Sequence, residues 1–365
     1  MALSIMVLFG GVSTEYLISL RSAYNIIQGL RETGCRVMPV GITPAGDWYR
    51  YNGPDEDIPA DRWREHITAS GGQPAAVAPI RSPRAFIVAI CGCEPDCIFP
   101  AVHGINCEDG ALQGLLTLSG FPYVGCGVLA SAAGMDKLHA KMVFRYARIP
   151  QCRFTSAART DIKRDVQAVA GKVAAATGFP CFLKPSNGGS SIGTCRAADM
   201  DELVAALGEV SQYDRTVVIE EFVRAREIEV AVMGNDRPRT ALIGEVATSD
   251  QVEYYDYEAK YFMADGAEVV LPAELDEKTA ARIRRYAIKA YKAFGCTGLA
   301  RVDFFISRDT GAVYINEINT LPGFTPISLF PKAFAASGIP LKQLVRRLCR
   351  LAIQDHAAQS RKELI

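Results

Sequence analysis

The order of apolar and polar runs along the chain predicts an α/β protein. An apolar run at residues 5–9 ends at Gly10 and Gly11, and residues 13–28 then carry apolar side chains at helical spacing. A strand, a glycine turn and a helix in that order begin a doubly wound α/β domain. Apolar runs at residues 36–40, 85–90 and 97–102 predict further strands of one parallel sheet, and the polar, proline-rich residues 43–83 predict an excursion from it.

The pattern changes after residue 130. One predicted helix covers residues 161–177 and ends at Gly178, and another begins in the acidic cluster at residues 199–202. From residue 221, alternating strands precede one strong helix whose apolar positions recur at helical spacing: Ile283, Ala287, Ala290 and Phe294.

These changes predict three domains, over residues 1–130, 131–220 and 221–358. The amphipathic residues 341–353 predict a C-terminal helix that packs on the body of the protein rather than on a membrane.

Composition narrows the class of protein. The 40 basic and 40 acidic residues balance, which argues against a nucleic-acid surface. Eleven cysteines, an odd number, favour free thiols in a reducing cytosol. Cys91, Cys93 and Cys97 lack the second paired motif of a zinc site and are predicted to be buried. Without a basic leader or a membrane-length apolar run, we expect a soluble cytoplasmic protein with no membrane partner.

The stretch RVDFFISRDTGAVYINEIN, residues 301–319, predicts a hairpin that holds a metal ion. A three-residue turn at its centre sets Asp303 opposite Glu317 and Arg301 opposite Asn319, all on one face. Carboxylate and amide oxygens suit Mg²⁺, which also binds substrate phosphates. The alternative is a solvated strand face, but directly opposed carboxylates repel each other without a cation.

The stretch KPSNGGSSIG, residues 184–193, predicts a phosphate-binding loop of an unusual kind. In the P-loop G-x-x-x-x-G-K-[ST] the lysine follows the glycines, whereas here it precedes them at the end of an apolar strand. The acidic hairpin is a candidate partner that would hold magnesium against the same phosphates.

Seven blocks in the same order resemble the D-alanine–D-alanine ligase family of ATP-grasp enzymes, from Val7 to about Leu348. They are FGGVSTEYLISLRSA, FPAVHGINCEDGALQG, YVGCGVLASAAGMDK, FLKPSNGGSSIG, VIEEF with REIEVAV, YYDYEAKY, and RVDFF with NEINTLPGF. The resemblance implies a three-domain ATP-grasp architecture: an N-terminal doubly wound parallel sheet plus two α+β domains that clamp the nucleotide.

The resemblance also implies roles at the nucleotide. ATP phosphates would be held by Lys137, Lys184, Ser190, Ser191 and the backbone of Gly188 and Gly189. The adenine hinge would be Glu220, Phe222 and Val223, the ribose ligand Glu227, and the closing loop would carry Lys260 and Tyr261. Two Mg²⁺ ions, or Mn²⁺, would be bound by Asp303, Glu317 and Asn319.

For the substrates, the resemblance implies that Glu15 pairs with the ammonium of a first D-alanine, with His103 close by. Arg301 and the Gly323 backbone would hold the oxyanion of the tetrahedral intermediate, and Ser328 and Leu329 would line the second subsite. The catalytic set is then Glu15, Ser190, Tyr261, Arg301 and Gly323. Without the resemblance, His103 could be a satisfied core histidine, and Glu15 could simply complement a helix dipole.

The expected reaction is ATP-dependent ligation of two D-alanines through an acyl phosphate, for peptidoglycan precursor synthesis, by a homodimer. Alternatives are a sister ligase that uses D-serine or D-lactate, and a nucleotide-binding regulator without chemistry. The chain departs from the family pattern at Leu17, Cys107 and Pro326-Ile327, all near the predicted substrate site. The apolar branch of Leu329 and the presence of Tyr261 rather than a histidine favour D-alanine as second substrate.

Overall fold

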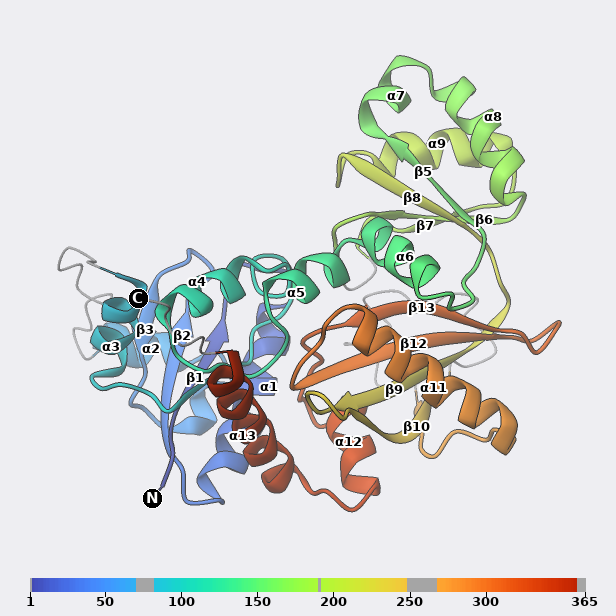
Figure 1. Ribbon diagram of the computed structural model, residues 1–365. Helices are drawn as coiled ribbons and strands as arrows, with labels where there is room; N and C mark the ends of the chain where they lie inside the picture. Colours follow the sequence, from blue (N-terminus) through green and yellow to red (C-terminus); the bar gives the residue numbers. More distant parts are fainter. Residues whose placement is uncertain (1, 70–81, 190–191, 248–267, 360–365) are drawn as a thin grey trace, which may run out of the picture.

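Three β-sheets with flanking helices make up the described part of the fold. The computed structural model describes residues 2–69, 82–189, 192–247 and 268–359 (Figure 1). In this part of the chain, no helix combines the length and apolar character needed to span a membrane.

The N-terminal sheet has helices on both faces. Its unit contains β1 (Ser4–Gly10), α1 (Tyr16–Arg31), β2 (Arg36–Ile42), β3 (Trp48–Arg50), a 3₁₀ turn (Asp55–Asp57), α2 (Trp63–Ala69), α3 (Pro83–Cys91), β4 (Cys97–Pro100) and α4 (Ala111–Ser119). β1 pairs in parallel with β2 and β4, and β3 is an antiparallel edge strand. Val7 and Phe9 of β1 share a core with α1, whereas Met6 and Leu8 share another with α3 and α4. The doubly wound arrangement is therefore confirmed.

The prediction of a strand at residues 85–90 is wrong, because this segment is helix α3. Ser82 caps the helix by accepting a hydrogen bond from the Ala85 N–H at 3.1 Å, and Pro83 occupies the first turn. Gly92 ends it with a left-handed φ of 71°. A short apolar run does not distinguish a buried strand from a helix, and here the end signals decide.

The central sheet is antiparallel, in the order β5-β8-β6-β7. This unit contains β5 (Phe154–Ala158), α7 (Arg159–Arg164), α8 (Val166–Thr177), β6 (Cys181–Pro185), β7 (Cys195–Ala197), α9 (Met200–Val210) and β8 (Thr216–Glu221). The single helix expected over residues 161–177 is broken at Asp165, whose side chain caps α8 at the Ala168 N–H. Its predicted end at Gly178 is confirmed.

The C-terminal sheet has the order β11-β10-β9-β12-β13. Its strands are β9 (Ala225–Met233), β10 (Arg239–Ala247), β11 (Glu268–Val270), β12 (Leu299–Ser307) and β13 (Val313–Asn319), and its helices are α11 (Glu277–Ala293), α12 (Leu329–Ala336) and α13 (Leu341–Gln359). The predicted apolar face of α11 is confirmed, because Ile283, Ala287 and Ala290 are buried against this sheet.

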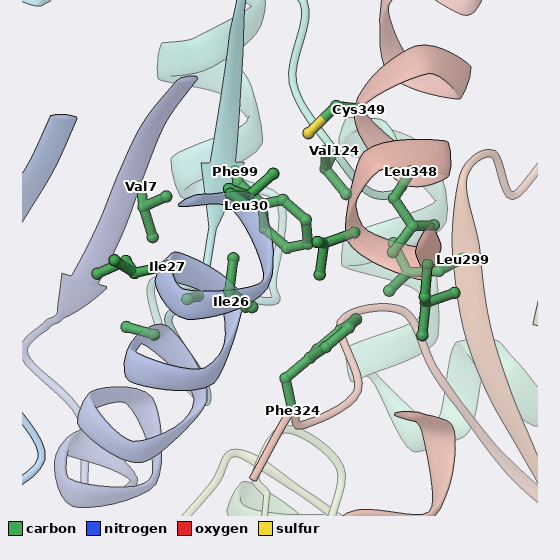
Figure 2. Packing of buried hydrophobic residues seen from close by; sticks show 14 of the residues in the cluster. Val7, Ile26, Ile27, Leu30, Phe99, Val124, Leu299, Phe324, Leu348 and Cys349 are labelled. Carbon is green, nitrogen blue, oxygen red and sulfur yellow. The ribbon is translucent and has the colours of Figure 1, made fainter. Parts of the chain in front are cut away.

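Two helices pack across the expected domain limits (Figure 1). α6 (Lys137–Tyr146), which follows α5 (Val128–Met135), shares a core with β9, β12 and α11 of the C-terminal unit. α13 packs instead on α1 of the N-terminal unit, where Leu348 and Cys349 join the core of Leu30 and Phe99 (Figure 2). The N- and C-terminal units are therefore joined by a shared core, whereas the central unit has a core of its own.

Candidate active site

One cavity collects most of the predicted site residues. Its volume is about 810 Å³, and all three units contribute to its walls. It is lined by Glu15, His103, Lys137, Lys184, Glu220, Phe222, Val223, Glu227, Arg301, Glu317, Asn319, Gly323 and Ser328. Asp303 and Leu329 lie behind its wall. The predictions for Ser190, Ser191, Lys260 and Tyr261 fall outside the described residues.

The N-terminal unit reaches the cleft through loops after two adjacent parallel strands. Glu15 follows β1 and His103 follows β4, and the carboxyl ends of parallel strands meet at one sheet edge, where α/β folds bind ligands. The turn after β1 requires glycine: Gly10 has a φ of 85°, and a Cβ there would lie 2.1 Å from the Ile42 carbonyl oxygen.

Glu15 occupies the N-cap position of α1, but its side chain makes no capping hydrogen bond. A Cβ at Gly104, whose φ is 80°, would lie 2.6 Å from Glu15 Oε2, and one at Gly189 would lie 3.1 Å from it. The carboxylate therefore points between the His103 loop and the phosphate loop, which favours a ligand-facing role over simple compensation of the helix dipole.

His103 is 4 % exposed and has a hydrogen-bond partner for each ring nitrogen. Nδ1 lies 3.1 Å from Glu108 Oε1 and Nε2 lies 3.1 Å from Ser22 Oγ. The Ser22 hydroxyl also accepts a hydrogen bond from the Phe324 N–H at 3.1 Å, so this network ties α1 to the loop after β13. Burial would lower the pKa of His103, but the Glu108 and Glu15 carboxylates raise it above its ordinary value.

The predicted nucleotide residues Lys184 and Glu220 lie on two neighbouring strands. Phe182 of β6 is the register partner of Glu220 on β8, which brings the Lys184 ammonium within 2.7 Å of Glu220 Oε2. The other oxygen of Glu220 forms an ion pair with Lys141 of α6. Burial alone would raise the pKa of Glu220, but the two lysines lower it to about 2. Glu220 is thus paired with Lys184 and with Lys141, contacts that the sequence did not predict.

Lys137 reaches the same end from the start of α6. Its ammonium donates a hydrogen bond to the Gly188 carbonyl oxygen at 2.6 Å. Asp136 fixes this arrangement, because it accepts hydrogen bonds from Ser186 Oγ at 2.7 Å and from the Asn187 amide at 3.1 Å. Burial lowers the pKa of Lys137 despite the nearby carboxylate of Glu317, and Lys184 lowers it further. A negatively charged phosphate beside these two lysines would offset both the burial of the Lys137 charge and its repulsion by Lys184.

The predicted adenine hinge lies at the end of β8 beside the cleft. The Phe222 N–H donates to the Pro180 carbonyl oxygen at 3.0 Å and is therefore not available to a base. Arg196 lies over the Phe222 ring, 5.2 Å from its centroid. Val223 and Glu227 line the cavity beyond it.

The register predicted for the hairpin is confirmed for the two pairs that carry the predicted site residues. Arg301 lies opposite Asn319 and Asp303 opposite Glu317. Closer to the turn the register shifts by one residue, so a bulge at Asn316 interrupts the alternation of β13. Asn316 consequently lines the cleft beside Glu317, and its side-chain oxygen lies 3.4 Å from the Lys184 ammonium.

Arg301 changes the interpretation of the two opposed carboxylates. Its guanidinium makes a two-pronged contact with Asp303 at 2.8 and 2.6 Å and lies 3.3 Å from Glu229. These carboxylates raise the pKa of Arg301 well above its ordinary value, even though burial acts in the opposite direction. Asp303 therefore has a cation beside it already, and the opposition of Asp303 and Glu317 does not by itself demand a metal.

The donor set nonetheless fits magnesium. Glu317 and Asn319 present hard oxygen ligands to the cleft near the two lysines that would face phosphates, and Asp303 stands directly behind. No cluster of three or more His, Cys, Asp or Glu side chains within the described ranges has the arrangement of a metal site. Such a small set suits Mg²⁺, which keeps waters and takes further ligands from substrate phosphates.

The residues predicted for the second substrate come from the loop between β13 and α12 and the start of α12. Gly323 and Ser328 line the cavity, and a Cβ on Gly323 would lie 2.9 Å from Ser328 Oγ. Leu329 does not face the cavity. It is 3 % exposed, and its side chain occupies the space next to Gly244 of β10, where a Cβ would lie 2.0 Å from Leu329 Cδ1. The expectation that its apolar branch meets the second D-alanine is therefore corrected.

The three departures from the family pattern lie around the site rather than in its walls. Leu17 is 43 % exposed and Ile327 is 54 % exposed. Cys107 is buried against Gly11, and burial raises the pKa of its thiol to about 12. None of the three side chains lines the cavity.

Among the described residues, side chains that contact site residues but were not singled out from the sequence include Ser22, Lys141, Glu229 and Asn316. The spacing of Lys137 and Lys141, four residues apart on one helix, was a signal that both could face the same side. Glu229 lies opposite Asp303 in the pairing of β9 with β12, so alternation along β9 could have placed it. A bulge such as that at Asn316 carries no comparable signal in its own sequence.

Family models match most of the chain. The model described as "D-ala D-ala ligase N-terminus" matches residues 4–126, and the one described as "D-ala D-ala ligase C-terminus" matches residues 143–350.

Curated relatives and solved structures agree with these matches. The D-alanine--D-alanine ligase of Ruminiclostridium cellulolyticum is 42% identical over 359 residues, covering 96% of this chain and 95% of that one. That of Acetivibrio thermocellus is 44% identical over 366 residues, covering 96% of each. The D-alanine-D-alanine ligase structure from Coxiella burnetii has a TM-score of 0.81 at 34% identity, covering 98% of this chain and 96% of that chain.

The VanG D-Ala:D-Ser ligase structure from Enterococcus faecalis also has a TM-score of 0.81, at 33% identity, covering 96% of this chain and 100% of that one. Both structures therefore share the ATP-grasp fold of this chain over nearly its whole length. With family models matching both halves and relatives above 40% identity across the molecule, the chain belongs to the D-alanine–D-alanine ligase family.

Proposed function

We propose that this cleft joins two molecules of D-alanine into D-alanyl-D-alanine, with conversion of ATP to ADP and phosphate, for cell-wall precursor synthesis. One observation carries the proposal: a single cavity has a lysine-rich end at Lys137 and Lys184 and an acidic end at Glu15. The first end suits the phosphates of ATP, and the second suits the ammonium of an amino acid. Arg301 and Glu317 line the same cavity.

In the first step, a carboxylate oxygen of the first D-alanine attacks the γ-phosphorus of ATP, and the bond from that phosphorus to ADP breaks. Glu15 holds the ammonium of this D-alanine, so that its carboxylate points toward the phosphates. Lys137 and Lys184 neutralise the charge that builds up on the transferring group. The product is an acyl phosphate, which is a far better electrophile than a carboxylate.

In the second step, the amine of the second D-alanine attacks the acyl carbon, and phosphate leaves. Arg301 and the Gly323 N–H stabilise the oxyanion of the tetrahedral intermediate. Ser328 lines the second subsite. Glu317, Asn319 and Asp303 would hold Mg²⁺, two ions by the family resemblance and replaceable by Mn²⁺, which would neutralise phosphate charge.

The test is phosphate release from ATP with D-alanine or L-alanine, with and without magnesium, while products are identified by mass. We expect release that needs both D-alanine and magnesium, together with the dipeptide. Release with L-alanine but not with D-alanine would contradict the proposal. Competition between D-alanine and D-serine at equal concentration tests the second substrate, and D-alanyl-D-serine as the main product would support the sister-ligase alternative.

We also propose a homodimer that acts in the cytoplasm, where ATP is available. The chain has no charged residue from residue 110 to residue 135, a stretch that includes α4 and α5. Leu118 and Leu129 are 74 % and 79 % exposed there, as expected of a surface that another subunit covers. Light scattering during size-exclusion chromatography gives the mass of the assembly, and a mass of 39.6 kDa would contradict the dimer.

A further inference from the structure

Lys141 is a buried lysine whose role neither the proposed chemistry nor the family resemblance explains. Its side chain is 4 % exposed and lies behind the cavity wall. Its ammonium forms an ion pair with Glu220 and lies 5.1 Å from the centroid of the Phe154 ring. Within the described residues, the ammonium has no further hydrogen-bond partner. Burial of a lysine is costly unless the charge is paired, so Glu220 is the reason this residue can be charged.

Glu220 in turn has two cations. Lys184 approaches one carboxylate oxygen at 2.7 Å from the cleft side, and Lys141 approaches the other from the protein side. The side chains of Glu220 and Lys184 are 6 % and 14 % exposed. One carboxylate shared by two ammonium groups leaves one positive charge in excess, and Lys184 is the partner that faces the cavity.

A phosphate that binds Lys184 must compete with Glu220 for it. If Glu220 had no second cation, movement of Lys184 toward a phosphate would leave a buried carboxylate unpaired. An uncompensated buried charge is unfavourable, so this movement would weaken nucleotide binding. With Lys141 in place, Glu220 stays neutralised and Lys184 can be released.

We propose that Lys141 is a positioning residue for ATP. It stays paired with Glu220 and neutralises its charge when Lys184 moves from Glu220 to the nucleotide phosphates. This role rests on the proposed function, because it requires ATP in this cleft. It makes Lys141 the fixed counter-charge and Lys184 the exchangeable one.

The test is steady-state kinetics of Lys141→Met, which keeps the length of the side chain but removes its charge. The KM for ATP should rise about tenfold, equivalent to about 1.4 kcal/mol, because Glu220 is left without a cation when Lys184 moves to the phosphates. The value of kcat at saturating ATP and the KM for D-alanine should change less than about threefold. Lys141→Arg should restore the wild-type KM for ATP, since its positive charge can pair with Glu220.

A double-mutant cycle separates this role from a general loss of packing. In a Glu220→Gln background, Lys141→Met should no longer change the KM for ATP, because there is no carboxylate left to neutralise. Lys172→Met, an exposed lysine of α8, is the control and should leave all parameters unchanged.

Circular dichroism melts and direct titration with ADP accompany the kinetics. An unchanged KM for ATP in Lys141→Met, or an equal effect in both backgrounds, would overturn the proposal for Lys141. A wild-type protein that binds no ADP and forms no dipeptide would instead overturn the proposed function.

Discussion

The two ends of the cleft hold their charged side chains in different ways. At the proposed nucleotide end, Lys184 and Glu220 lie on paired strands and form an ion pair. At the substrate end, Glu15 and His103 stand on loops, and His103 is held by hydrogen bonds to Ser22 and Glu108.

This difference follows what each end must bind. ATP phosphates carry several negative charges, and in our proposal Lys184 leaves the Glu220 carboxylate to bind them. A zwitterionic amino acid needs orientation more than charge, and a hydrogen-bonded network anchored on α1 and the loop after β13 supplies it. We therefore expect charge removal to be most damaging at the nucleotide end and loss of a single hydrogen bond to be milder at the substrate end.

The largest effect is expected for Lys184→Met. Loss of a preorganised cation at the transferring phosphate should lower kcat/KM for ATP about a thousandfold, or about 4 kcal/mol. The fold should survive, because Glu220 keeps its pair with Lys141. Steady-state kinetics and a thermal melt check both points. A fall in kcat/KM for ATP of less than about tenfold would show that Lys184 does not contact the transferring phosphate.

One carboxyl group at each end should change the free energy of unfolding in opposite directions as the pH falls. Because the folded-state pKa of Glu220 is about 2, below its ordinary value of 4.5, its stabilising contribution is present above pH 4.5 and is lost as pH falls toward 2. The contribution is up to about 3 kcal/mol. Burial instead raises the pKa of Glu108, so its contribution is largest below pH 4.5 and falls as pH rises through that pKa.

Urea unfolding at pH 6 and pH 3 tests this contrast. Glu220→Gln should reduce the acid loss of unfolding free energy, whereas Glu108→Gln should leave that loss as large or make it larger. An equal reduction in both variants would show that the two ends do not differ in this respect.

Removal of a metal ligand should come next. Glu317→Gln should lower turnover about a hundredfold, or about 2.7 kcal/mol, and should raise the magnesium concentration needed for half-maximal activity. Activity is measured as a function of magnesium at saturating ATP and D-alanine. A variant with full activity and the wild-type magnesium dependence would show that the hairpin is not the metal site.

The smallest effect is expected for Ser22→Ala, at the substrate end. The change removes the hydroxyl between His103 and the Phe324 N–H and should lower kcat/KM for D-alanine about tenfold, or about 1.4 kcal/mol. The KM for ATP should stay within about twofold. Ser119→Ala is the matched control, because Ser119 is equally buried but donates to the Leu116 carbonyl oxygen away from the cleft. Equal kinetic losses in both variants would reduce Ser22 to a packing role.

The hairpin shows how much of the site could be predicted. Strand alternation and the turn fixed the pairs Arg301–Asn319 and Asp303–Glu317, because the side-chain period of a strand is two residues. The bulge at Asn316 could not be predicted in the same way, since it depends on how β13 meets its neighbours.

Two errors have a similar cause. Residues 85–90 suit a strand as well as a helix, but of these only Ile87 and Ile90, three positions apart, are buried. Leu329 follows the predicted substrate residue Ser328, but the start of α12 turns its side chain onto Gly244 of β10, 85 positions away in the sequence.

By itself, the sequence determined the strands and helices with clear end signals, the register of the hairpin over residues 301–319, and the position of Lys184 near the end of a strand. These depend on neighbouring residues, whose spacing is fixed by the covalent chain. Tertiary structure decided the sharing of Glu220 by Lys141 and Lys184, the bond from Ser22 to His103, and the contact of Arg301 with Glu229. Each of these joins residues from different elements, and a buried charge or hydroxyl takes the partner that packing brings within reach.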